Sequence, residues 1–335
     1  MKIYFAPLEG VTGYIYRNAF EEFYGKGQIN QYFIPFISPN QTNGFTAREV
    51  RDMNPDNNCG LPVVVQIMTN RADYFSKTVE MLYEKGYDEV NLNLGCPSGT
   101  VVAKYRGAGF LAIPDQLDTF FETIFESPLI KTGAVKVSAK TRLGIENAQE
   151  FTELLQIFNR YPLKELIIHP RVQKDYYNNT PDWEKFREAV NHSSNPVCYN
   201  GDIFTLKDYQ KFRKEFPDVE SVMLGRGLIA DPGLLSAIRA FDAGITLERQ
   251  PEKEQQVLKQ FHDRIYTEYL KIMSGDKNVI HKMKEIWFYQ KQTFDNSEKA
   301  FKKIKKAQKM CDYEAAVNQF FSQASFAVRD NIYFG

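Results

Sequence analysis

One cysteine of this chain lies where a side chain could take part in chemistry. Hydrophobic residues alternate over 90–94 as in a β-strand, Gly95 and Pro97 end that pattern, and Cys96 falls on the turn between them. Free cysteine has a pKa of about 8.5, so near neutral pH its thiol is mostly protonated and can donate a proton. The spacing therefore predicts a reactive thiol presented on a strand-to-helix turn.

A glycine-rich basic segment, residues 99–110, follows this cysteine. It contains Lys104 and Arg106 with the aromatic Tyr105 between them, and three glycines that allow an irregular backbone. We expect a flexible loop that closes as a lid over an anionic substrate, with both cations toward it.

Two polar residues stand at the ends of other predicted strands. Lys140 and Gln66 would be costly to bury without partners. A flavin ring offers partners, because a lysine stabilises the negative charge of its N1/O2 edge after reduction and a glutamine amide can pair with its imide edge. Alternatively, Lys140 extends to water and has no ligand.

Glycine-containing motifs at two adjacent strand ends are typical of phosphate binding through backbone N–H groups. They are Asn200-Gly201-Asp202 and Gly225-Arg226-Gly227. Each alone could be a tight turn, but their occurrence on neighbouring strands favours a phosphate site. His169 could contact the same ligand or terminate its strand.

These residues can form one site only in a fold that brings the ends of several strands together, and the hydrophobic pattern predicts such a fold. Short β-type runs alternate with helical spacing, as over 74–83, 151–158 and 206–216, which is typical of βα units. The predicted strands are 3–8, 32–37, 62–68, 89–95, 134–139, 165–169, 197–200 and 221–224. Eight alternations predict an α/β fold of the (β/α)8 TIM-barrel type, with function at the carboxyl ends of the strands. A doubly wound sheet is the alternative.

The hydrophobic period changes after Gln250-Pro251. We predict a catalytic barrel domain over 1–245 and a small all-α helical-bundle domain over 251–335, without strands. Residues 251–335 carry 15 basic and 11 acidic side chains, whereas the whole chain is balanced at 42 each. Much of this excess lies on one lysine-rich stretch, which includes Lys302, Lys303, Lys305 and Lys306.

Cysteine spacing and hydropathy exclude several other classes of protein. The four cysteines lack Cys-x-x-Cys spacing, so disulfide frameworks and metal centres have no support, and we expect Cys59, Cys198 and Cys311 to be buried structural residues. No apolar run approaches the roughly 20 residues needed to cross a bilayer, and we find no signal peptide. We expect a cytoplasmic protein with no membrane association.

Seven motifs, taken together, resemble the tRNA-dihydrouridine synthases of the bacterial, FMN-dependent type. APLEGVTG, QIM, NLNLGCPS with RGAGFL, KTRLG, HPR, NGD and GRG occur in the family's order at about its spacing, and the helical tail resembles the family's RNA-binding domain. The resemblance implies that FMN is held by Pro7, Leu8, Glu9, Gln66, Lys140, His169, Asn200, Gly201, Asp202, Gly225 and Arg226. Val172, where the family often has threonine, departs from the pattern.

The resemblance also implies the reaction. NADPH, or NADH, reduces FMN, a hydride passes to uracil C6, and Cys96 protonates C5, while Asn93 and Arg142 face the target uridine and its nucleotide. Because a stacked base must be flipped out to react, we expect the lysine stretch, with Lys104 and Arg106, to bind the tRNA backbone. No obligate protein partner is implied. The alternatives are a dihydroorotate dehydrogenase-like enzyme acting on a free pyrimidine, and an RNA-binding protein that has lost the reaction.

Overall fold

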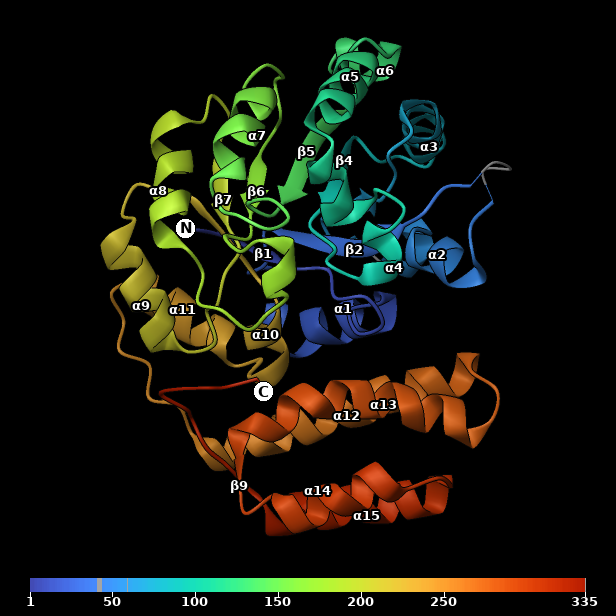
Figure 1. The fold of residues 1–335 in the computed structure, drawn as a ribbon. Coiled ribbons are helices and arrows are strands. Elements are labelled where there is room, and N and C mark those ends of the chain that lie inside the picture. Colours follow the sequence, from blue (N-terminus) through green and yellow to red (C-terminus); the bar gives the residue numbers. More distant parts are fainter. Residues whose placement is uncertain (41–43, 59, 335) are drawn as a thin grey trace. The chain divides into compact units, whose positions relative to one another are not determined.

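Eight parallel strands close into a barrel in which each strand pairs with the next along the chain (Figure 1). This computed structural model describes residues 1–40, 44–58 and 60–334. The strands are β1 (Lys2–Phe5), β2 (Gln31–Ile37), β3 (Val63–Ile67), β4 (Glu89–Leu94), β5 (Lys136–Thr141), β6 (Leu166–Ile168), β7 (Val197–Tyr199) and β8 (Ser221–Leu224). The predicted (β/α)8 barrel is therefore confirmed, and the doubly wound alternative is wrong.

Strand β5 extends two residues beyond its predicted end. Lys140 pairs in register with Asn93 of β4 and with Ile167 of β6, so its backbone belongs to the sheet although its side chain is polar. The hydrophobic pattern misses this end because the two residues that extend the strand, Lys140 and Thr141, are polar.

The chain divides into two compact units. The first comprises residues 1–7, 30–202 and 218–223 and therefore contains almost all of the barrel. Its helices are α2 (Ala47–Asp52), α3 (Ala72–Glu84), α4 (Gly99–Val102), α5 (Pro114–Phe125), α6 (Pro128–Lys131), α7 (Glu150–Phe158) and α8 (Trp183–His192). Helices α3, α5, α7 and α8 lie outside the strands (Figure 1). They pack through rows of large apolar side chains, as where Phe75 of α3 meets Phe120 of α5 with ring centroids 5.6 Å apart.

The second unit comprises residues 8–29, 203–217 and 224–335. Its helices are α1 (Tyr14–Phe20), α9 (Leu206–Glu215), α10 (Arg226–Ala230), α11 (Leu234–Asp242), α12 (Pro251–Ile272), α13 (Asp276–Gln290), α14 (Glu298–Lys306) and α15 (Met310–Gln323). Phe261 of α12 contacts the ring of Tyr16 of α1, with the centroids 5.3 Å apart. The predicted tail of helices is present as α12 to α15, while the boundary between 245 and 251 stays a prediction.

Two short strands correct the expectation that the tail contains none. β9 (Phe294–Asp295) and β10 (Ser325–Phe326) pair antiparallel. Phe294 also packs on Phe320 of α15, with ring centroids 4.8 Å apart, so the strand pair is held by aromatic contacts that a two-residue pattern cannot reveal.

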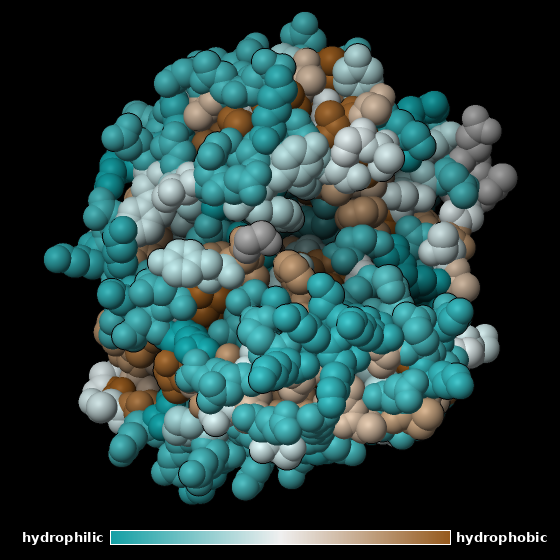
Figure 2. Space-filling model, turned by 60° about the horizontal axis from the view of Figure 1, so that its bottom comes forward, coloured by the Kyte–Doolittle hydropathy of each residue, from teal (hydrophilic) through white to brown (hydrophobic). Residues whose placement is uncertain are grey.

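The cysteines differ from one another in burial. Cys198 is buried, as predicted, whereas Cys311 is exposed, which corrects that part of the expectation; Cys59 lies outside the described residues. Cys311 is exposed because it lies in the first turn of α15, whose buried face is formed by other residues. Within the described ranges we find no helix long and apolar enough to span a membrane. The face drawn in Figure 2 is largely hydrophilic, with hydrophobic residues in separate small groups.

Candidate active site

The turn that carries Cys96 is held by the amide of Asn93. The Oδ1 atom of Asn93 accepts hydrogen bonds from the backbone N–H groups of Gly95, at 3.0 Å, and Cys96, at 2.9 Å. Asn93 is the fifth residue of β4 and is buried, so it cannot move without disturbing the barrel. The position of the thiol is therefore fixed by a strand of the barrel.

A buried amide network extends from Asn93 across three strands. Its Nδ2 atom donates to Gln66 at 2.6 Å, Gln66 donates to Asn91 at 2.7 Å, and Asn91 donates to Ser138 at 2.9 Å. Unpaired polar groups would be costly here, and these four side chains form hydrogen bonds with one another. Gln66 and Asn93 were predicted from the sequence, whereas Asn91 and Ser138 were not; their only signal was polarity inside two hydrophobic strands.

Glycine at position 107 allows the following loop to pack against the cysteine. Gly107 has a φ of 53°, and a Cβ atom there would lie 2.9 Å from the Cβ and carbonyl oxygen of Cys96. The N–H group of Ala108 donates to the same carbonyl oxygen at 3.0 Å. Cys96 is therefore held from both sides, by Asn93 before it and by this loop after it.

Much of the segment predicted to be a flexible lid is packed. Residues 99–102 form α4, Gly107–Ala112 forms a 3-10 helix, and Phe110 is buried with its ring centroid 5.3 Å from that of Phe120. Residues 99–100 and 103–105 of this segment, which include Lys104, are exposed, while Arg106 is half-buried. Glycine allows close packing here, while the closure of this segment over a substrate stays a prediction.

Lys140 places an amino group at the end of β5 without a neutralising partner. Burial and, after it, the nearby charge of Arg142 lower the pKa of Lys140 to about 7. Its Nζ atom makes no hydrogen bond or ion pair with any residue that the structure describes. An ammonium group held in this way fits an anionic ligand, such as the N1/O2 edge of a reduced flavin.

We expect Lys140→Met to stabilise the flavin-free protein while weakening flavin binding. Below pH 7 the folded protein holds a charged, partly desolvated Lys140, which lowers the free energy of unfolding. This destabilisation shrinks as pH rises from 7 toward about 10.4, the pKa of lysine in the unfolded chain. The gain in melting temperature should therefore be largest at pH 6 and smallest near pH 10. Thermal unfolding and FMN titration measure the two effects; a melting temperature lower than that of the parent at pH 6 would contradict this account.

Arg142 joins the cysteine turn to the loop after β6. Its Nε atom donates to the carbonyl oxygen of Gly95 at 3.0 Å, and its terminal nitrogens donate to those of Val172, at 2.9 Å, and Tyr176, at 2.7 Å. The guanidinium group is almost fully buried and lies over the ring of Tyr177, 5.4 Å from its centroid. Its predicted contact with a nucleotide stays a prediction, because these observed contacts are all internal.

Arg171 organises two residues that were predicted to hold the cofactor. It donates to Nε2 of His169 at 2.9 Å and forms a two-point ion pair with the carboxylate of Asp202. A second connection comes from Gln173, whose amide donates to the carbonyl oxygen of Pro97, beside Cys96, at 2.8 Å. Arg171 and Gln173 were not among the predicted site residues; the HPR motif was the available signal for the first, and the second lies two residues beyond that motif.

The remaining predicted cofactor residues are divided between the two units. Pro7, Asn200 and Gly201 belong to the first unit, in which Asn200 donates to the carbonyl oxygen of Met223 at 2.8 Å. Leu8, Glu9, Gly225 and Arg226 belong to the second unit. There, the guanidinium carbon of Arg226 lies 4.9 Å from the ring centroid of Phe204 and 5.4 Å from that of Phe334. The phosphate-binding role of these glycines and of Arg226 stays a prediction.

The predicted basic surface is present on α14. Ala300, Phe301 and Ile304 form its buried face, while Lys302, Lys303, Lys305 and Lys306 are exposed on the other side. Lys303 donates to Gln319 of α15 at 2.7 Å, which helps to fix this face on the bundle. The result is a row of cations that projects into solvent.

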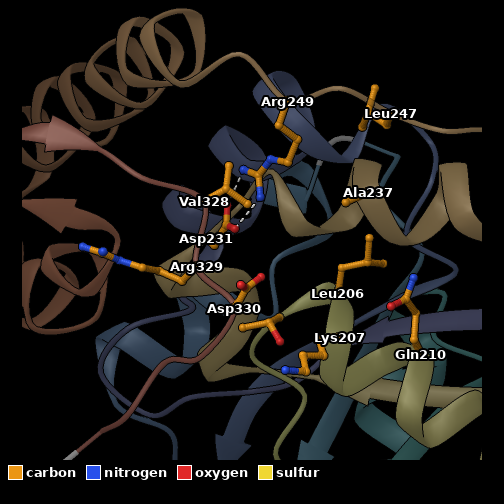
Figure 3. A pocket seen from close by; sticks show the side chains of 11 residues that line it. Leu206, Lys207, Gln210, Asp231, Ala237, Leu247, Arg249, Val328, Arg329 and Asp330 are labelled. Atoms are coloured by element: carbon orange, nitrogen blue, oxygen red, sulfur yellow. Dashed lines mark hydrogen bonds and ion pairs between the residues drawn. The ribbon is translucent and has the colours of Figure 1, made fainter.

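A cavity of about 600 Å³ in the second unit is a separate feature (Figure 3). Its charged lining is largely neutralised internally: Arg249 pairs with Asp231 and Glu254, and Arg329 pairs with Asp295 at 2.9 Å. Burial opposes the charge on Arg249, but these two carboxylates keep its pKa above the ordinary value. These charges pair within the protein, and the lining of this cavity includes none of the predicted site residues.

Comparison with known proteins gives matches over nearly the whole chain. The model of a family described as dihydrouridine synthase matches residues 4–325. The tRNA-dihydrouridine(16) synthase of Neisseria meningitidis serogroup A is 24% identical over 322 residues, 95% of this chain and 94% of that protein. The enzyme of the same name from Aquipseudomonas alcaligenes is 26% identical over 256 residues, 73% of this chain and 77% of that one. A solved structure of morphinone reductase in complex with tetrahydroNAD aligns with a TM-score of 0.49 and 11% identity, covering 76% of this chain and 90% of that one.

Proposed function

This chain belongs to the dihydrouridine synthase family, and we propose that it reduces specific uridines of tRNA to 5,6-dihydrouridine, with FMN as its cofactor and NADPH as the reductant. The observation that carries the proposal is a single arrangement in the barrel. The turn that carries Cys96 is held by Asn93 and Gly107 and follows β4, which pairs with the strand of Lys140, and the amino group of Lys140 has no partner among the described residues.

The residues of the first unit fit a flavin. When bound and reduced, FMN supplies the hydride that is added to uracil C6. The ammonium form of Lys140 would compensate the negative charge of a bound flavin, and binding an anion would raise the pKa of Lys140 from about 7. Gln66 uses one N–H group and its oxygen within the buried network, which leaves one N–H group for a ligand. The resemblance also assigns FMN contacts, each a proposal by itself, to Pro7, Leu8, Glu9, His169, Asn200, Gly201, Asp202, Gly225 and Arg226.

Cys96 supplies the proton that is added to uracil C5. As the hydride reaches C6, the electron pair of the C5–C6 double bond moves toward C5, and the Cys96 S–H bond breaks to form the new C5–H bond. The thiolate that remains is reprotonated from solvent. Asn93 and Gly107 keep the sulfur in place before the substrate arrives, which lowers the entropic part of the barrier.

Arg142 and Arg171 act as positioning residues in this proposal. Arg142 holds the Cys96 turn and the 172–177 loop together, and Arg171 orients His169 and Asp202.

The RNA must present an unstacked uracil to a barrel mouth. Flipping a base costs a few kcal/mol, which contacts elsewhere must offset. The cations on α14, together with Lys104 and Arg106, supply contacts of the required kind to RNA phosphates. We propose that residues 251–335 form the tRNA-binding region.

Replacing Lys302, Lys303, Lys305 and Lys306 with alanine should raise the Michaelis constant for tRNA and flatten its salt dependence. Each lost phosphate contact removes nearly one unit from the slope of log affinity against log salt. Since these side chains are exposed, the melting temperature should change little. Steady-state assays at several salt concentrations give both quantities.

A matched control removes four exposed lysines elsewhere: Lys77, Lys85, Lys136 and Lys214. Both variants lose the same net charge, so a general electrostatic effect would reduce the salt slope equally in the two. We expect the control to keep most of the salt slope of the parent. Equal slopes in the two variants would show that RNA does not bind at α14.

The choice between tRNA and a free pyrimidine can be tested on the purified flavoprotein. We expect NADPH oxidation to accelerate with an unmodified tRNA transcript and not with orotate. Efficient turnover of free dihydroorotate without activity on tRNA would favour the dehydrogenase alternative. A preparation that neither retains nor takes up FMN would exclude both enzymatic functions.

A further inference from the structure

Tyr105 is an exposed aromatic residue in an unusual backbone conformation. Its φ is 51°, in the left-handed region that bulky residues rarely adopt, and 52% of its surface is exposed. Its side chain makes no hydrogen bond, ion pair or ring contact with the residues that the structure describes. The fold therefore accepts both a backbone cost and an exposed ring at this position without a stabilising contact in return.

The backbone around Tyr105 is nevertheless well fixed. Its N–H group donates to Val102 at 2.9 Å, that of Arg106 donates to Val101 at 3.2 Å, and the side chain of Asn70 donates to the carbonyl oxygen of Lys104 at 3.3 Å. The ring is thus presented from a turn that is held before any ligand binds, which reduces the entropy lost on binding.

The same turn is attached directly to the catalytic cysteine. Gly107 lies two residues after Tyr105 and packs against Cys96. The N–H group of Ala108 donates to the carbonyl oxygen of Cys96 at 3.0 Å. The ring of Tyr105 and the thiol of Cys96 are therefore carried by one packed segment of the first unit.

Two cations accompany the ring. Lys104 is exposed and Arg106 is half-buried, and neither side chain forms an ion pair within the described residues. An aromatic ring between unneutralised cations has the chemistry of a single-stranded RNA contact, because bases stack on the ring while the cations attract phosphates.

We propose that Tyr105 stacks on an unpaired tRNA base next to the target uridine. This inference rests on the proposed function, since flipping the target uracil leaves its neighbour without a stacking partner. Tyr105 then replaces that lost stacking beside the site, and Lys104 and Arg106 hold the adjoining phosphates.

The test is equilibrium binding of an unmodified tRNA transcript to the flavin-loaded protein without NADPH, over a range of salt. We expect Tyr105→Ala to weaken binding by about 5-fold or more, with the salt slope unchanged, because stacking releases no counterions. Tyr105→Phe should bind like the parent. Lys104→Ala with Arg106→Ala should instead reduce the salt slope.

Two further variants separate stacking from folding. Tyr105→Gly removes the ring but suits a positive φ, so it should weaken tRNA binding while its melting temperature stays within about 3 °C of the parent. Tyr83→Ala removes another tyrosine, 45% exposed on α3, and should leave binding unchanged.

Unchanged affinity in both Tyr105→Ala and Tyr105→Gly would overturn the inference. A reduced salt slope in Tyr105→Ala would also overturn it, because the ring would then only position the cations. If the parent protein makes dihydrouridine but these variants bind normally, only the stacking contact is refuted. If the parent makes none, the proposed function itself has failed.

Discussion

Cys96→Ala should keep its flavin and lose most of its dihydrouridine formation. A positioned general acid contributes typically 10²–10⁴-fold to the rate, and no other thiol of the described residues lies on this turn. The hydrogen bonds of Asn93 to the turn are made to backbone N–H groups, so they survive the substitution and the cofactor site should remain intact. Flavin absorbance per protein and mass spectrometry of tRNA nucleosides measure the two outcomes.

Cys311→Ala is the matched control for this variant. It removes an exposed thiol from α15 and, at saturating tRNA, should leave both flavin content and the rate of the chemical step unchanged. Cys96→Ala activity within a factor of two of the parent would refute the role of Cys96 as the proton donor. Loss of flavin in Cys96→Ala would instead show that the turn contributes to holding the cofactor.

Gly107→Ala should slow the reaction by about 10²-fold without removing Cys96. The added methyl group would lie 2.9 Å from two atoms of Cys96 and about 3.0 Å from Val101, and the φ of 53° is strained for any residue except glycine. The cysteine or the loop must shift, and a displacement of about 1 Å at a reacting group can cost this much in rate. Single-turnover kinetics with bound flavin would measure the effect on the chemical step.

Gly99→Ala provides a comparison from the same segment. A Cβ atom at position 99 meets nothing within 4 Å, so we expect a rate close to that of the parent. Equal rates for Gly107→Ala and the parent would mean that the contact between the loop and Cys96 does not control the position of the thiol. Equal losses in the two variants would point to a general effect of stiffening the segment.

The barrel could be predicted from the sequence because its strands carry a local hydrophobic signal. The run at 221–224 coincides with β8, and 62–68 differs from β3 by one residue at each end. β5 was placed too early, since Lys140 and Thr141 are polar although both belong to the strand. The hydrophobic pattern along the sequence identifies the buried apolar residues of a strand, but not the polar residues by which the strand extends into the site.

Contacts between distant residues explain what the sequence did not reveal about the site. Arg142 reaches Gly95, 47 residues earlier, and Gln173 reaches Pro97, 76 residues earlier. Such pairs depend on the closed barrel bringing strand ends together, so no spacing rule along the chain identifies them. Arg171 was visible as part of the HPR motif, yet its ion pair with Asp202 requires β6 and β7 to lie side by side.

The segment after Cys96 contains glycines whose role the sequence alone did not reveal. Its glycines suggested mobility, but Gly109 packs against Val102, where a Cβ atom would lie 2.6 Å from the carbonyl oxygen, and Gly107 packs against Cys96. Close approach and flexibility both require glycine, and composition alone does not distinguish them.

The central claim is tested most directly by analysing tRNA nucleosides after reaction. An unmodified tRNA transcript is incubated with the flavin-loaded protein and NADPH, digested, and examined by mass spectrometry, with Cys96→Ala treated in parallel. The account predicts dihydrouridine in the parent reaction and a strongly reduced amount with the variant. Absence of dihydrouridine from a preparation that binds FMN and oxidises NADPH would contradict the account.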